Sequence, residues 1–247
     1  MTEKEILEGA TDDQIEAIKN YEGPCFILAG PGSGKTFTII SRAQYMIKKG
    51  VDPSSIMMFT FTCKAANEIK DRIKTAIGQD GERIMAGTYH SICSKILRKY
   101  ADRMGYTKKF SIYDTEDVKN SLKDIIDSKD IDIYSVISYI SGKKNKMISP
   151  KIAMRAAESN LDTTMASYYS KYQNNLKKNN AMDFDDLIGN AIELLENNPD
   201  VLSKINKKYK YIIADESHDS APRDLKLIKL LAGKDENICF IADEEQS

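Results

Sequence analysis

Short apolar runs alternate with amphipathic stretches over the first 104 residues of the chain. The apolar runs are too short for buried helices and predict strands at residues 25–29, 56–61 and 83–88. The stretches that follow them have helical spacing, at residues 34–49, 63–77 and 90–104. Thr11 and Gln14 are spaced as a capping box, which predicts a short helix before the first strand.

The pattern changes between residues 106 and 178, where no convincing strand is found. This block predicts helices at 115–128, 133–141, 150–159 and 163–178, with a mobile polar loop at 141–146. Strands return at 211–214 and 238–242, on either side of a helix at 223–231. Strands that alternate with helices predict an α/β fold with a parallel sheet. We therefore expect a core formed by residues 1–94 and 183–247, interrupted by an all-helical insertion at 95–182.

The balance of basic and acidic residues differs between the same blocks. Residues 95–182 contain 17 Lys or Arg and 10 Asp or Glu, whereas the rest contains 19 basic and 27 acidic residues. A basic segment in an acidic body fits a polyanion partner, and it fits a charged, solvated helical region equally well.

Several classes of protein are disfavoured by composition. No apolar stretch approaches the ~20 residues of a membrane span, and the polar N-terminus is unlike a secretory signal. The four cysteines are widely spaced, which disfavours disulfides or an iron–sulfur cluster. Reduced thiols in a cytoplasmic protein without a membrane partner are the expectation.

A phosphate-binding loop follows the first predicted strand. It consists of Ala29, Gly30, Pro31, Gly32, Ser33, Gly34, Lys35 and Thr36, with alanine in place of the usual first glycine. The glycines let backbone N–H groups close around phosphate oxygens. Lys35 supplies a positive charge to the β- and γ-phosphates, and Thr36 offers a hydroxyl to Mg²⁺. The strand–loop–helix context predicts a nucleoside triphosphate with Mg²⁺.

Acidic side chains follow the strand at 211–214. Asp215 is a candidate Mg²⁺ ligand opposite Thr36, and Glu216 a candidate base for the attacking water. Without the phosphate loop, these residues would be two solvated acids. Gln246 follows the last strand and is a candidate contact to the γ-phosphate or the water.

Seven motifs in order resemble those of the UvrD/Rep-like family of superfamily I DNA helicases. They lie at residues 11–14, 29–36, 59–66, 87–91, 183–187, 215–219 and 243–247. The resemblance covers most of the chain and implies a RecA-like core that binds ATP and Mg²⁺. It also implies that Gln14 reads the adenine edge. Phe37 stands where an arginine is common, and it could stack on adenine.

The resemblance places a single-stranded DNA track on two motifs. Phe61 and Tyr89 would stack on bases, which suits sequence-blind translocation. Phosphate contacts are implied for Thr60, Thr62, Thr88 and His90. The alternatives are a core position for Phe61 and a local bond for His90. Basic residues of the insertion (Lys143, Lys144, Lys146) are expected to reach the duplex or its backbone.

The implied function is that of the N-terminal part of an ATP-dependent single-stranded-DNA translocase, which couples hydrolysis to 3′–5′ unwinding at duplex junctions. His218 replaces a glutamine common in the family, and Ala242 precedes Asp243 where Gly-Asp is common. We expect a second RecA-like domain to be missing in cis, so that this chain alone hydrolyses ATP poorly. The alternatives are a nucleotide-gated DNA-binding module, an RNA-directed helicase and a small P-loop kinase.

Overall fold

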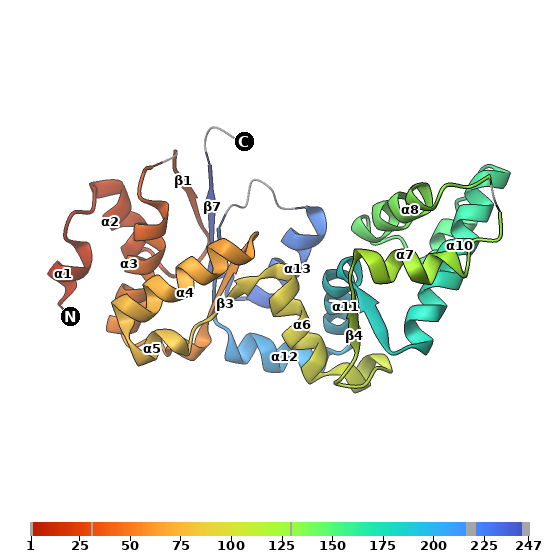
Figure 1. Cartoon of the computed structure of the whole chain (residues 1–247). Coiled ribbons are helices and arrows are strands. Elements are labelled where there is room, and N and C mark those ends of the chain that lie inside the picture. The colour runs from red at the N-terminus through yellow and green to blue at the C-terminus, as the bar shows by residue number, and fades with distance from the viewer. Residues whose placement is uncertain (1, 31, 129, 216–220, 244–247) are drawn as a thin grey trace. The chain divides into compact units, whose positions relative to one another are not determined.

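A five-stranded parallel sheet is the centre of the first of two compact units (Figure 1). The computed structural model describes residues 2–30, 32–128, 130–215 and 221–243. From one edge to the other, the strands are β1 (Cys25–Leu28), β7 (Ile238–Ala242), β6 (Tyr211–Ala214), β2 (Ile56–Thr60) and β3 (Met85–Thr88). Every neighbouring pair is parallel. All five carboxyl ends therefore lie along one edge of the sheet, where open α/β folds bind ligands.

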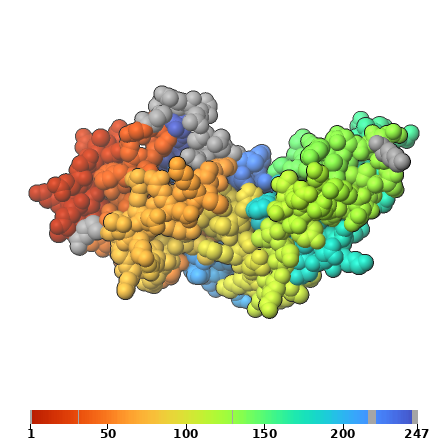
Figure 2. Space-filling model, in the orientation of Figure 1, coloured from red at the N-terminus to blue at the C-terminus, as the bar shows by residue number. Residues whose placement is uncertain are grey.

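Helices α3 (Lys35–Lys48) and α4 (Cys63–Ile77) pack their apolar sides against one face of this sheet. Their contact is a buried cluster that includes Ile39, Met46, Ile73, Met58, Ile213 and Ile241. Helix α4 forms part of the visible surface in Figure 2. The other helices of this unit are α1 (Glu3–Leu7), α2 (Asp12–Lys19), α5 (Gln79–Glu82) and α12 (Pro199–Lys208), with a 3₁₀ turn at Pro53–Ser55.

The predicted strands and helices of the sheet unit are confirmed with small changes at their ends, except that the helix predicted at 90–104 ends at Lys99 and a 3₁₀ turn follows it. The capping box is present: Thr11 accepts a hydrogen bond from the Gln14 backbone, and the Gln14 side chain accepts one from Thr11. Two strands, Tyr211–Ala214 and Ile238–Ala242, have the predicted bounds. Local signals suffice here because each short apolar run is bounded by turn or cap residues.

The second unit is mostly helical but is not all-helical. Strands β4 (Ser111–Tyr113) and β5 (Ala181–Asp183) form a small parallel pair. Its helices are α7 (Thr115–Lys123), α8 (Ile133–Asn145), α9 (Pro150–Arg155), α10 (Asn160–Lys178) and α11 (Phe184–Asn197), with a 3₁₀ turn at Ala101–Met104. A three-residue strand is too short to show a period in sequence, so the prediction missed β4. Helix α6 (Tyr89–Lys99) and helix α13 (Pro222–Ala232) each contribute residues to both units.

The boundary between the units differs from the expected one. The first unit comprises Met1–Ile92, Pro199–Ser220 and Asp224–Ser247, and the second comprises Cys93–Asn198 with Ala221–Arg223. The segment 183–198 therefore belongs with the insertion rather than with the sheet unit. The reason is that β5 pairs with β4 and that α11 packs against α8.

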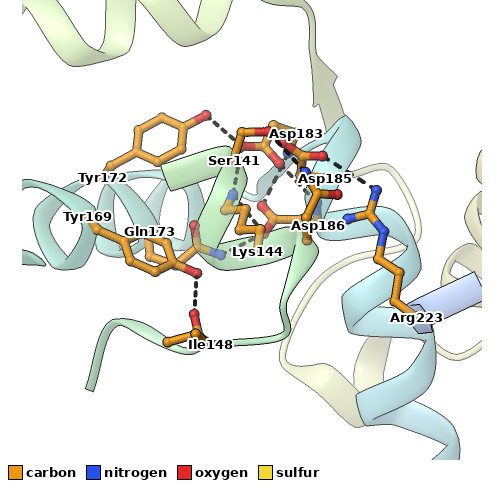
Figure 3. Close-up of polar contacts among 11 residues, drawn as sticks. Ser141, Lys144, Ile148, Tyr169, Tyr172, Gln173, Asp183, Asp185, Asp186 and Arg223 are labelled. Carbon is orange, nitrogen blue, oxygen red and sulfur yellow. Dashed lines mark hydrogen bonds and ion pairs between the residues drawn. The ribbon is translucent and has the colours of Figure 1, made fainter. Parts of the chain in front are cut away.

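The predicted mobile loop at 141–146 is wrong, because α8 continues through it to Asn145. Within α8, Lys144 is buried and its ammonium nitrogen lies 2.6 Å from Asp183 Oδ2 and 2.8 Å from Asp186 Oδ1 (Figure 3). The Tyr172 hydroxyl also donates to Asp183, at 2.9 Å, and the Gln173 amide donates to Asp186, at 2.8 Å. The expectation that Lys144 reaches DNA is therefore wrong, because its charge is used inside the unit.

The four cysteines are free, and two of them face each other across β1 and β7. Cys25 is half-buried, and its register partner Cys239 is buried. A hydrogen bond from Cys239 lowers the pKa of the Cys25 thiol to about 6, and the nearby Arg42 guanidinium adds to this effect. Among the described residues, no helix has the length and apolarity that crossing a membrane requires.

Cys25 is therefore expected to react as a thiolate at neutral pH. Its iodoacetamide alkylation rate, followed by peptide mass spectrometry, is expected to be half-maximal near pH 6. The exposed Cys63 serves as an internal labelling control. Cys239→Ala removes the hydrogen bond and is expected to move the midpoint upward. A wild-type midpoint at the ordinary thiol value of about 8.5 would contradict this prediction.

Candidate nucleotide and nucleic-acid site

The glycine loop between β1 and α3 has the backbone shape that its sequence predicts. Gly32 and Gly34 have φ values of 73° and 85°, a region that other residues rarely adopt. Gly34 is the N-cap of α3 and has no side chain with which to cap the helix. The first turn of α3 is described in full and contains no acidic residue. Backbone N–H groups at this helix start are therefore available to an anion.

Gln14 joins the capping box of α2 to the glycine loop. Its side-chain nitrogen donates to the Ser33 carbonyl at 2.8 Å, while its side-chain oxygen accepts from the Thr11 backbone at 3.0 Å. A Cβ atom on Gly34 would lie 2.8 Å from the Gln14 nitrogen, so a side chain there would displace the Gln14 amide in addition to straining the positive φ. The structure thus brings two of the predicted nucleotide-binding elements together.

Lys35 makes an ion pair that the sequence analysis missed. Its ammonium nitrogen lies 2.7 Å from Asp243 Oδ2, with side-chain exposures of 22% and 9%. Asp243 directly follows β7, which pairs with β1 along four residues up to Leu28 and Ala242. The available signal was an aspartate at the end of an apolar strand, which is also the position of Asp215. The pair shows that the loop already holds an anionic oxygen at the lysine.

Of the remaining catalytic candidates, Asp215 is described, and it lies at the same edge of the sheet. Asp215 is half-buried at the end of β6, and its backbone N–H donates to the Phe59 carbonyl at 3.0 Å. Strand β7 lies between β6 and β1, so the tips that carry Asp215 and the glycine loop are second neighbours. Thr36 is half-buried, and Phe37 is 37% exposed in the first turn of α3. Pro31, Glu216, His218 and Gln246 lie outside the described residues.

An aromatic cluster lies at the carboxyl ends of β2 and β3. The Tyr89 ring centroid is 4.8 Å from that of Phe59 and 5.4 Å from that of Phe61. Phe59 and Tyr89 are buried, whereas Phe61 is half-buried. Phe61 is therefore the ring of this cluster that has an accessible side, and the buried Tyr89 ring packs against it.

The polar candidates around this cluster make local hydrogen bonds. Thr60 is buried and donates to the Thr62 carbonyl at 3.2 Å. Thr62 is exposed and caps α4 by accepting from the Ala65 backbone. Thr88 is buried and accepts from the Ser91 backbone at 3.2 Å, and His90 is half-buried in α6. The DNA-binding roles of these residues stay predictions.

The class of protein is that of P-loop nucleotide-binding folds. It is defined by the parallel sheet, by the glycine loop that leaves the start of α3 without a side-chain cap, and by the lysine at the sheet edge. Within it, the chain belongs to the UvrD/REP helicase N-terminal domain family, whose model matches residues 10–247. This match confirms the resemblance inferred from the seven motifs.

Among known relatives, the chain is 40% identical over 248 aligned residues to the ATP-dependent DNA helicase PcrA of Staphylococcus aureus. It is 39% identical to the protein of that name from Staphylococcus epidermidis. Each alignment covers 98% of this chain and 34% of the relative. The chain therefore spans about a third of the length of these curated relatives.

Proposed function

We propose that this chain is the N-terminal ATP-binding part of an ATP-dependent DNA helicase. The observation that carries the proposal is the glycine loop, in which Lys35 binds a carboxylate oxygen at 2.7 Å at the sheet edge. A carboxylate oxygen is chemically close to the phosphate oxygens that such a loop binds. The family match and the helicase name of the relatives support DNA as the second ligand.

In the proposed complex, the backbone N–H groups of the glycine loop and of the first turn of α3, together with the Lys35 ammonium, bind the phosphates of ATP. Thr36 and Asp215 would hold Mg²⁺, which neutralises phosphate charge when it is bound. Gln14 and Phe37 are the proposed contacts to the base, and Gln14 also fixes the loop through Ser33. The proposed base for the attacking water is Glu216, and Gln246 is the proposed γ-phosphate contact.

For DNA, we propose that Phe61 stacks on a base and that the buried Tyr89 holds its ring in place. Stacking of this kind does not depend on the base, as a translocase requires. The threonines and His90 would position the backbone. Turnover is proposed to need a second RecA-like domain in cis, because residues supplied across the cleft accelerate phosphoryl transfer by ~10³–10⁵. Unwinding at duplex junctions is then a property of the longer protein.

Phe61→Ala is expected to weaken binding of a fluorescent oligothymidine about 10-fold, because one stacked base contributes roughly 1–3 kcal/mol. ATP affinity is expected to stay unchanged, since Phe61 directly follows β2 and is not part of the glycine loop. Phe26→Ala is the matched control, because Phe26 is 60% exposed on β1 of the same unit. Fluorescence anisotropy measures the two affinities, with labelled oligothymidine over a salt series and with fluorescent ATP.

A steep fall in oligonucleotide affinity with salt is expected for a phosphate-tracking surface. Absence of oligonucleotide binding at low salt, with ATP binding intact, would instead favour the small P-loop kinase. Equal binding of oligouridine would favour the RNA-directed alternative.

A further inference from the structure

The Lys35–Asp243 pair differs from the other lysine–carboxylate pairs of the sheet unit. Pairs such as Lys49–Glu3 and Lys74–Glu82 have side chains that are 39–67% exposed, which is typical of solvated pairs of small energetic effect. At the glycine loop the exposures are 22% for Lys35 and 9% for Asp243. A pair this enclosed is weakly screened, and removing one partner leaves a poorly solvated charge.

Asp243 is not needed to join the two strands. Strands β1 and β7 are already paired in register from Cys25 with Cys239 to Leu28 with Ala242. The Ala29 backbone N–H extends this pairing by donating to the Ala242 carbonyl at 3.1 Å. The ion pair therefore acts on the position of the Lys35 side chain rather than on the sheet.

We propose that Asp243 is a positioning residue that holds the Lys35 ammonium in the loop and competes for it with the terminal phosphates of the nucleotide. This inference rests on the proposed function. A phosphate oxygen and the Asp243 carboxylate are both anions that require the same ammonium donor. Nucleotide binding must therefore loosen the pair, so occupancy of the loop is transmitted to the tip of β7, where the last motif begins. The competition also lowers the affinity for ATP.

The test measures the affinity of the full chain for fluorescent ATP, ADP and AMP, in EDTA and in Mg²⁺. Asp243→Asn is expected to tighten ATP and ADP binding about 10-fold in EDTA and to leave AMP unchanged, because AMP has no β- or γ-phosphate. Asp243→Glu restores a carboxylate and is expected to return the affinity toward the wild-type value. Asp235→Asn, an exposed acid before the other end of β7, is the matched control.

The double variant Lys35→Ala/Asp243→Asn separates competition from simple charge repulsion. If Asp243 acts through Lys35, its substitution has no effect on ATP affinity in the Lys35→Ala background. An equal gain in both backgrounds would overturn the proposal in favour of direct repulsion. Unchanged or weaker ATP binding by a folded Asp243→Asn variant would also overturn it, while leaving the proposed function intact. Failure of the wild-type chain to bind any nucleotide would reject the proposed function itself.

Discussion

Lys144→Ala is expected to lower the free energy of unfolding of the helical unit by about 3–5 kcal/mol. Lys144 is 6% exposed and lies between Asp183 and Asp186, with its ammonium nitrogen 5.1 Å from the centre of the Tyr172 ring. Its removal leaves two buried carboxylates side by side without their cation. The remaining donors are the Tyr172 hydroxyl, the Gln173 amide and the backbone N–H groups of Asp183 and Asp186. All of them are neutral and cannot balance that charge.

Hydrogen exchange followed by mass spectrometry is the appropriate measurement, since it reports the stability of α8, α10 and α11 separately from the sheet unit. Lys146→Ala is the matched control, because Lys146 is exposed immediately after α8. Adding Asp186→Asn to the Lys144→Ala chain removes one of the two charges and is expected to recover part of the protection. Protection in Lys144→Ala equal to that in Lys146→Ala would contradict the prediction.

Low pH is expected to reduce the loss of stability that Lys144→Ala causes. Burial raises the pKa of Asp186 above its ordinary value, with Asp183 raising it further and Lys144 opposing both. A carboxyl whose pKa is raised in the folded state binds protons more tightly there than in the unfolded chain. Its contribution to stability is therefore present at low pH and is lost as pH rises through the raised pKa. The difference between Lys144→Ala and wild type should shrink as pH falls.

The sheet unit was predictable because its signals are local. A short apolar run, a glycine turn and a capping box each specify one element, and the helix Cys63–Ile77 has its predicted bounds. The stretch 141–146 misled the prediction because glycine and three lysines in a row of six polar residues are typical of a loop. The acids that stabilise Lys144 lie 39 and 42 positions later in the chain, so its burial could not be seen from the residues around it.

The candidate site, too, was predictable from sequence only in its local parts. The loop 29–36 and the acid Asp215 were visible as strand–polar junctions, and parallel pairing brings their strand ends to one edge. The sequence did not show which strand lies beside which. Because β7 rather than β6 is the neighbour of β1, the residue that meets Lys35 is Asp243. Strand order depends on pairing between segments about 200 residues apart, which no local pattern encodes.

Gly34→Val is expected to weaken ATP binding about 100-fold or more. Position 34 has a φ of 85°, which costs a β-branched residue roughly 1–3 kcal/mol. A Cβ atom there would also lie 2.8 Å from the Gln14 amide nitrogen, so the link between α2 and the loop would have to break. Both effects displace the backbone N–H groups that are proposed to bind phosphate, and each 1.4 kcal/mol lost is a factor of ten.

Gly50→Val is the control that separates backbone strain at a positive φ from a change in the geometry of the nucleotide site. Gly50 has a φ of 93° at the other end of α3, and a Cβ atom at this position would meet nothing within 4 Å, so this variant should lose stability but keep its ATP affinity. Gly34→Ala, alone and combined with Gln14→Ala, tests the contact itself, because removing the glutamine side chain relieves the clash. Titration with fluorescent ATP compares the four proteins. Full ATP affinity in a folded Gly34→Val variant would show that the loop backbone does not bind the nucleotide.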